Sequence, residues 1–185
     1  QVYRDELGSY FDPSAQQWRA MQPPTVGWGP APPDVAPLLG VEVGTEVLIR
    51  DRIMGDPETG RTYQLATSYL PEHLARGTVL AERDTGPGGI YDRLEEMGHG
   101  PLRWTEAVSA RMPTPEETKQ LALPPGVPVL RIVRTAISPA GVVCEVNDTR
   151  MSAAEFEVGY TIRRSSSARW PRQESDANTP EDRGR

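Results

Sequence analysis

Two arginines, Arg50 and Arg52, carry the clearest potential for chemistry because they stand two positions apart in an apolar run. In a β-strand, residues two positions apart point to the same face, so the two guanidinium groups could bind one anion together. If that face is buried, the two cations require an anionic partner. If it is exposed, they are solvated strand residues balanced by Asp51 on the other side.

A glycine-rich stretch, residues 84–94, is the second candidate for anion binding, because it runs into a predicted helix over residues 89–97. The start of a helix leaves free N–H groups at a positive dipole end, so the amides of Gly88, Gly89 and Ile90 could hold a phosphate or a carboxylate. The stretch has neither the Lys-Ser or Lys-Thr of a Walker loop nor the spacing of a dinucleotide-binding loop. The alternative is that the glycines only turn the chain.

Groups suited to catalysis or to metal binding are few. His73 and His99 lie in separate polar contexts, and no GxSxG motif is present. The single thiol, Cys144, lies in an apolar run and is predicted to be a packed core residue. Glu145, which follows it, could orient polar groups of a ligand or simply stand at a strand edge. We therefore expect no enzyme, no metal site and no cofactor.

A pattern that occurs twice organises the middle of the chain. Residues 33–52 and 115–134 each predict a short helix with proline near its first turn, a turn with glycine, and a strand that ends in arginine. Thr114 and Glu117 predict a capping box at the second helix. A polar turn then leads to another strand in each copy, over residues 62–70 and 142–151, and further strands are expected at 103–112 and 155–163. Hairpins joined by helices predict an α+β domain, an antiparallel sheet with helices on one side.

The two ends of the chain differ from this middle part. Residues 1–32 mix aromatic residues with Pro and Gly without a period and predict an extended lead-in segment, anchored by Tyr10, Phe11 and Trp18. The folded domain is expected over residues 33–164. Residues 165–185 are rich in Ser, Arg, Asp, Pro and Glu, a composition that predicts a disordered tail.

Composition and charge restrict the partners of the chain. With 26 acidic and 20 basic side chains the net charge is −6, so we do not expect these residues to bind duplex DNA directly. No signal peptide and no apolar run of roughly 20 residues is present, which argues against a membrane partner. We expect a cytoplasmic location. The first residue is a glutamine, which suggests a piece of a longer protein.

The order of several short motifs resembles a known family. They are Val47 to Arg52, the run Gln-Leu-Ala-Thr-Ser-Tyr-Leu-Pro at 64–71, Gly-Ile-Tyr-Asp-Arg-Leu at 89–94, Pro128 to Arg134, and Gly141 to Glu145. Together they resemble the UTRA domain, the effector-binding half of GntR/HutC transcription regulators, over about residues 33–163. The wording of residues 84–91 is similar to an actinobacterial branch of that family.

This resemblance implies a chorismate-lyase-like fold, a homodimer and a small-molecule effector. It also implies an N-terminal winged helix-turn-helix that this chain does not contain and through which the regulator would bind DNA. Effectors of the family are often phosphosugars, amino-acid derivatives or other small acids.

The resemblance also assigns site residues, position by position. The two strand arginines of the phosphosugar-binding members match Arg50 and Arg52, and their glutamate after the second hairpin turn matches Glu145. The chain departs from the pattern at three positions, where a serine, a glutamate and a tyrosine of the family are Gly89, Ala66 and Met151. We therefore expect an anion corner formed by Arg50, Arg52 and the loop amides of Gly88, Gly89 and Ile90. The remaining pocket would be less polar, lined by Ala66, Tyr91 and Met151, and would suit an apolar carboxylic acid better than a phosphosugar.

Two other functions remain open. The same fold serves a lyase that cleaves an aromatic acid, so an enzyme is one alternative. The other is a dimerisation module without a ligand, in which Met151 and Tyr91 fill the pocket.

Overall fold

The computed structural model describes residues 2–4, 10–11 and 19–160 of the chain, with side chains from Arg19 to Tyr160. Of the three expected anchors, Trp18 lies outside the described residues, as do the side chains of Tyr10 and Phe11. The predicted tail over residues 165–185 also lies outside them.

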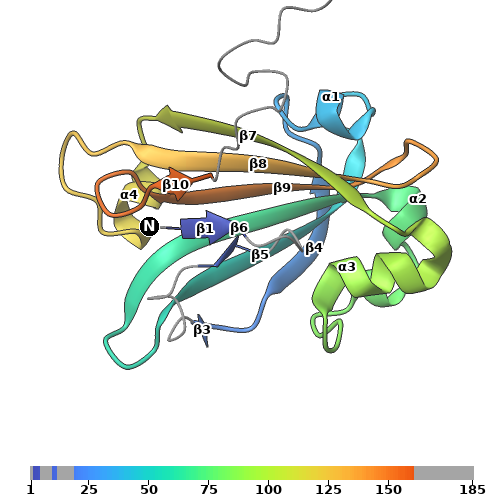
Figure 1. Cartoon of the computed structure of the whole chain (residues 1–185), viewed down its shortest axis with the longest axis horizontal. Helices are drawn as coiled ribbons and strands as arrows, with labels where there is room; N and C mark the ends of the chain where they lie inside the picture. The colour runs from blue at the N-terminus through green and yellow to red at the C-terminus, as the bar shows by residue number, and fades with distance from the viewer. Residues whose placement is uncertain (1, 5–9, 12–18, 161–185) are drawn as a thin grey trace, which may run out of the picture.

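An antiparallel sheet of seven strands forms the body of the molecule (Figure 1). Its order is β3-β5-β6-β9-β8-β7, with β4 pairing beside β3 on the same edge of β5. The strands are β3 (Arg19–Ala20), β4 (Thr25–Pro30), β5 (Glu46–Asp56), β6 (Arg61–Pro71), β7 (Arg103–Arg111), β8 (Val129–Ile137) and β9 (Val143–Ser152). A small second sheet contains β1 (Val2–Arg4), β2 (Tyr10–Phe11) and β10 (Val158–Gly159).

The repeated pattern is confirmed as two equivalent units. Helix α1 (Ala36–Leu39) precedes the hairpin β5–β6, and helix α4 (Pro115–Gln120) precedes the hairpin β8–β9. The two hairpins meet where β6 pairs with β9, at the centre of the sheet. The α+β class and the large antiparallel sheet are thus as predicted.

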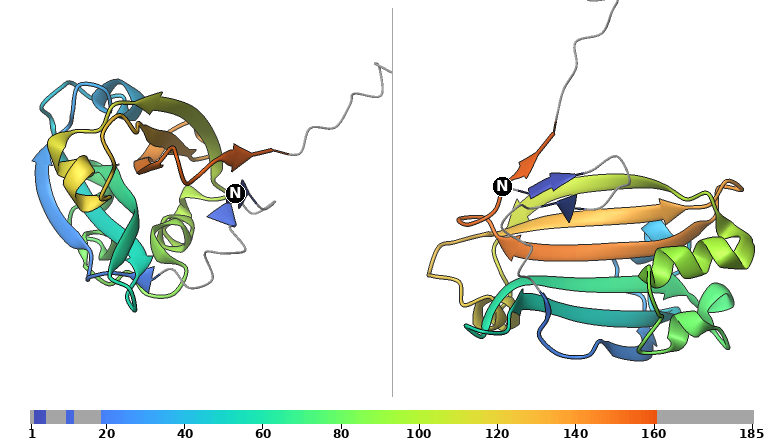
Figure 2. Two further views of the ribbon diagram at one scale, coloured as in Figure 1. Left: turned by 90° about the vertical axis from the view of Figure 1, so that its left-hand side faces the viewer. Right: turned by 60° about the horizontal axis from the view of Figure 1, so that its bottom comes forward.

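Helices cover both faces of the sheet, whereas the sequence analysis expected them on one side (Figure 2). Leu48 packs with Leu80 and Leu94, from the group formed by α2 (Glu72–Ala75), the 3-10 turn η2 (Val79–Ala81), α3 (Gly89–Leu94) and the wide turn η3 (Glu95–His99). Its neighbour Val47 packs with α1 on the other face. Because neighbouring strand residues point in opposite directions, a strand that is apolar at both positions must be covered twice. We call the side of the sheet that is covered by α3 the α3 face. The opposite side, covered by α1 and by the segment of α4, is the α4 face.

The ends of several elements differ from the sequence prediction. Strand β5 continues past Arg52 to Asp56, and the strand expected at 155–163 is only the two residues of β10. The expected helix 89–97 ends at Leu94 and widens into a π turn, where Gly98 adopts a φ of 89°. The capping box is confirmed, because Glu117 N donates to Thr114 Oγ1 (3.2 Å) and Thr114 N donates to Glu117 Oε2 (2.8 Å).

The predicted lead-in segment also contributes to the sheet, because β4 pairs with β5 from Thr25 to Pro30. Val26 and Trp28 pack against the α3-face cluster. Gly27 and Gly29, which alternate with them, carry no side chain on the opposite face. A Cβ on Gly29 would lie 3.0 Å from Ile49 Cδ1, so a larger residue there would require the Ile49 side chain to shift. The folded unit therefore begins before residue 33. None of the described helices is long and apolar enough to cross a membrane.

Candidate functional site

A row of polar side chains crosses the α3 face, where an apolar core would be the simpler solution. The register of five neighbouring strands places Arg50, Ser68, Asn147, Arg134 and Glu106 side by side. The first four residues are all less than 9% exposed. Buried polar groups cost free energy unless they are hydrogen-bonded, so a sheet that keeps such a row points to a function.

Hydrogen bonds fix most of this polar row. Ser68 Oγ accepts from Asn147 Nδ2 at 3.0 Å and from Arg52 Nη2 at 3.4 Å. Thr149 Oγ1 donates to Asn147 Oδ1 at 2.8 Å, and Arg134 Nε donates to Glu106 Oε1 at 2.8 Å. The polar row on the α3 face is therefore a buried and preorganised hydrogen-bond network.

Arg50 holds a loop against this polar row. Its Nη1 donates to the carbonyl of Leu80 (2.7 Å) and to that of Glu82, and its Nη2 donates to the carbonyl of Arg83 (3.1 Å). Burial, and next the charge of Arg52, lower the pKa of Arg50 below its ordinary value. Its buried Nε has no hydrogen-bond partner among the described residues. Three of its five N–H donors thus position the loop.

A cavity of about 300 Å³ opens between this loop, β5 and the stretch before β4. It brings three arginines together, Arg50, Arg52 and Arg83, against a single carboxylate, Asp84. Its other lining residues are Pro23, Pro24, Thr85, Gly89 and Ile90. The cavity is therefore lined by both positively charged and apolar side chains.

The structure places the expected site residues in two groups. The cavity is lined by Arg50, Arg52, Gly89 and Ile90. Gly88 comes directly before Gly89 in the loop and is not a lining residue. Ala66, Tyr91, Glu145 and Met151 also lie on the α3 face or in α3, but they are not among the lining residues of the cavity. Sequence reasoning missed Arg83, Ser68 and Asn147, of which the last two follow Ala66 and Glu145 at strand spacing.

The loop amides are less available for an anion than the sequence suggested. Gly89 N donates to the carbonyl of Gly86 at 3.2 Å. The carboxylate of Asp92 occupies the place where a Cβ of Gly88 would lie, at a φ of 80° that suits glycine. A carboxylate there would repel an anion, which leaves the arginine side chains as the cationic groups of this cavity.

Tyr91 and Glu145 form a second, deeper group with Trp104. The ring of Tyr91 packs edge-on against Trp104, with centroids 5.4 Å apart. Burial first, and the nearby Glu145 next, raise the pKa of the Tyr91 phenol, which therefore stays protonated. Glu145 is 1% exposed, and its Oε2 has no hydrogen-bond partner among the described residues.

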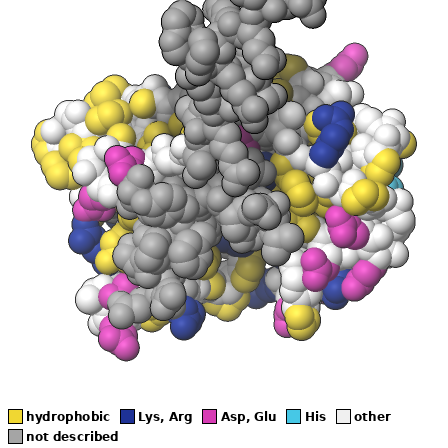
Figure 3. All heavy atoms as spheres, viewed as in Figure 1, with side chains coloured by type: hydrophobic (Ala, Val, Ile, Leu, Met, Phe, Trp, Pro, Cys, Tyr) yellow, Lys and Arg dark blue, Asp and Glu magenta, His cyan; other side chains and the backbone are white. Residues whose placement is uncertain are grey.

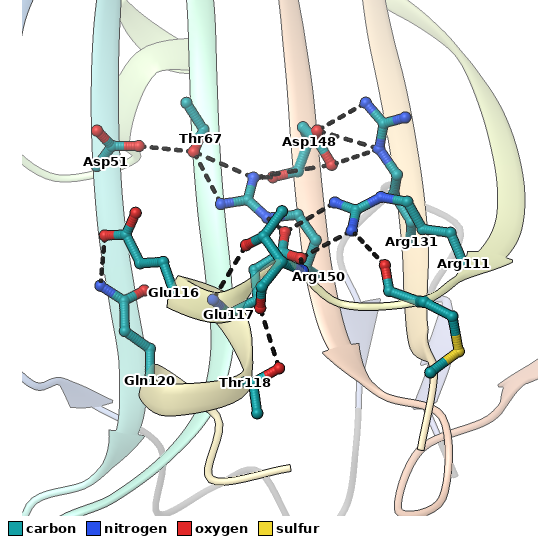
Figure 4. Close-up of polar contacts among 12 residues, drawn as sticks. Asp51, Thr67, Arg111, Glu116, Glu117, Thr118, Gln120, Arg131, Asp148 and Arg150 are labelled. Carbon is teal, nitrogen blue, oxygen red and sulfur yellow. Dashed lines mark hydrogen bonds and ion pairs between the residues drawn. The ribbon is translucent and has the colours of Figure 1, made fainter. Parts of the chain in front are cut away.

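A larger cavity, about 350 Å³, lies on the α4 face, and Figure 4 shows the polar network beside it. Its three arginines form ion pairs with carboxylates. Arg111 binds both carboxylate oxygens of Glu117 at 2.7 Å, and Arg131 binds Asp148 in the same way. We assign the ion pairs of Glu117 with Arg111 and Arg150 to holding α4 on the sheet, because they join this helix to β7 and β9.

Catalytic and metal-binding arrangements are not evident in the described part of the chain. Cys144 is fully buried in the α3-face cluster, and burial raises the pKa of its thiol, as expected for a core residue. Among residues 19–160, no group of three or more His, Cys, Asp or Glu side chains is placed to hold a metal ion.

Comparisons with known proteins agree with this picture. Residues 25–157 match the UTRA domain. The chain is 32% identical over 157 residues to an HTH-type transcriptional regulator of Streptomyces coelicolor, covering 81% of this chain and 56% of that protein. It is 31% identical over 106 residues to the HTH-type transcriptional regulator GgaR of Escherichia coli, covering 57% and 40%. The chain thus spans about half the length of these relatives, which are regulators rather than enzymes.

Solved structures show the same fold. The effector domain of PhnF from Mycobacterium smegmatis superposes with a TM-score of 0.64 at 20% identity, covering 82% of this chain and 91% of that one. The C-terminal domain of the histidine utilization repressor from Pseudomonas syringae superposes with a TM-score of 0.63 at 16% identity, covering 80% and 99%.

Proposed function

This chain belongs to the UTRA family and is the effector-binding domain of a GntR/HutC-type transcription regulator, and we propose that its effector is a small anion bound in the arginine cavity. The observation that carries the proposal is the convergence of Arg50, Arg52 and Arg83 on one cavity with a single carboxylate. Arg52 and Arg83 are exposed and can turn their guanidinium groups toward an anion, while the buried Arg50 holds the loop that carries Arg83 and adds its positive charge.

The apolar side of the cavity defines the body of the effector. Pro23, Pro24 and Ile90 present hydrocarbon to the ligand, and Asp84 and Thr85 are the other lining residues with a polar side chain besides the arginines. An organic acid or phosphate ester with an apolar body fits this lining better than a phosphosugar.

The ligand-free alternative is less well supported. Met151 is 2% exposed and Tyr91 packs on Trp104, so neither side chain fills the arginine cavity. A cavity that remains open beside three cations suits a ligand better than a purely structural module.

In the complete regulator, we propose that two copies pair and that a winged helix-turn-helix outside this chain binds DNA in the cytoplasm. Among the described residues visible in Figure 3, basic and acidic side chains are interspersed and form no basic patch of the kind that binds duplex DNA. The effector changes DNA binding only as far as it binds two arrangements of the dimer with different affinity.

A thermal-shift series tests the proposed ligand class. The probes are inorganic phosphate, phenyl phosphate, benzoate and, as the neutral match, benzyl alcohol. We expect phenyl phosphate or benzoate to raise the melting temperature and Arg52→Ala to abolish the rise. Arg103→Ala, an exposed arginine at the start of β7, should keep it. An equal rise with benzyl alcohol would contradict the assignment of an anion.

A further inference from the structure

The edge strand beside β5 is interrupted next to the arginine cavity. β3 pairs with Met54 and Gly55 of β5, and β4 pairs with the residues from Glu46 to Asp51. Met21 to Pro24 lie between β3 and β4 and do not pair regularly with β5, so the strand pairing on this edge is interrupted opposite Arg52 and Ile53. We call Met21 to Pro24 the edge break.

The edge break provides part of the cavity wall. Pro23 and Pro24 line the arginine cavity, whereas Gln22 and Thr25 line the larger cavity on the α4 face. Arg52 lines both, so the break lies at the one strand position that the two cavities share. The wall thus comes from a part of the chain that the sequence assigned to the lead-in.

Among the described residues, one backbone hydrogen bond joins the edge break to the sheet outside the regular strand pairing. Met21 N donates to the carbonyl of Ile53 at 2.9 Å, and Met21 Sδ lies 2.9 Å from where a Cβ of Gly55 would be. β3 itself is only two residues long, and both are exposed. Segments with such sparse attachment open locally at a low free energy compared with the rest of a domain.

We propose that the edge break completes the effector site, so that the bound effector fixes the segment before β4 onto the sheet. This inference rests on the proposed function, because it concerns the same cavity. If docking of the break raises the affinity for the effector by some factor, the bound effector raises the equilibrium constant for docking by that same factor. Occupancy of the cavity then acts directly on the chain that precedes the domain.

Hydrogen exchange of the Met21 amide tests this coupling on the full chain with phenyl phosphate as the probe. If opening of the break destroys the site, the exchange rate falls by the factor 1 + [L]/Kd, about tenfold when the probe is at ten times its Kd. The control is the Gly141 amide, which donates to the carbonyl of Ser138 (2.9 Å) in the β8–β9 turn and should not change.

A variant tests the reverse direction. Replacing Pro23 and Pro24 together by glycine removes the apolar wall and loosens the break without touching an arginine. We expect the Kd for phenyl phosphate to rise by about tenfold, while Pro139→Gly in the β8–β9 turn leaves it unchanged.

The outcomes separate this inference from the proposed function. Slower exchange at Met21 together with weaker binding by the double variant supports the coupling. If the probe binds but the Met21 exchange rate and the Kd of the double variant are unchanged, the inference is wrong and the proposed function stands. If phenyl phosphate does not bind the unaltered chain, both are overturned.

Discussion

At the scale of single residues, Arg50 and Arg52 perform different tasks although they point to one face. Arg50 is 3% exposed and donates to three loop carbonyls, whereas Arg52 is exposed and donates to Ser68 Oγ. The pair was predicted from its spacing. Their different roles were not predictable, because the loop carbonyls that Arg50 binds begin thirty residues further along the chain.

We expect Arg50→Ala to destabilise the domain by about 3 kcal/mol, since three carbonyls lose a charged donor. Arg52→Ala, the matched exposed arginine, should change the free energy of unfolding by less than about 0.5 kcal/mol. Urea unfolding of both variants measures the difference. Equal losses would show that Arg50 does not position the loop.

Glu117 gives a prediction about pH. Burial opposes its ionisation, but hydrogen bonds from Arg111 and from the Thr114 amide outweigh it and lower its pKa from 4.5 to about 2. Because the folded-state pKa is depressed, the ionised group stabilises the domain above pH 4.5, and this contribution disappears as the pH falls toward 2.

The stabilisation amounts to about 3 kcal/mol at neutral pH. Glu117→Gln should therefore flatten the fall in the free energy of unfolding between pH 5 and pH 2, about the range that the two pKa values define. Glu116→Gln, on the exposed side of the same helix, should leave it in place. A steep fall that persists in Glu117→Gln would refute the assignment.

At the scale of elements, local chemistry was predictable where one short motif decides it. The capping box of α4 and the two hairpins follow from Thr114, Glu117 and the polar turns. β4 was missed because glycines alternate with Val26 and Trp28 and conceal the strand period. Only pairing with β5, a contact between distant segments, makes this stretch a strand.

Truncation distinguishes the expected domain start from the observed one. A chain that starts at Pro33 lacks β4 and the packing of Val26 and Trp28, so we expect it to be less stable than one that starts at Arg19 by roughly 3 kcal/mol. Melting temperatures of the two chains provide the measurement. Identical values would place the start of the folded unit at residue 33 after all.

At the scale of the whole molecule, the sheet separates two kinds of polar cluster. On the α4 face the arginines form ion pairs with carboxylates, and two of these pairs hold a helix, whereas on the α3 face three arginines line a cavity with one carboxylate. The fold class and the arginine strand were predictable from the sequence. Arg83 was not, because only the folded loop brings it to Arg52.

The central claim is that this cavity binds an anion through Arg52 and Arg83. Titration calorimetry with phenyl phosphate tests it most directly, with the unaltered chain, Arg52→Ala, Arg83→Ala and the control Arg103→Ala. We predict that each of the first two variants weakens binding by about 10- to 100-fold, as expected for the loss of a charged hydrogen bond, and that the control binds as the unaltered chain does. Binding of equal strength in all four proteins would contradict the claim.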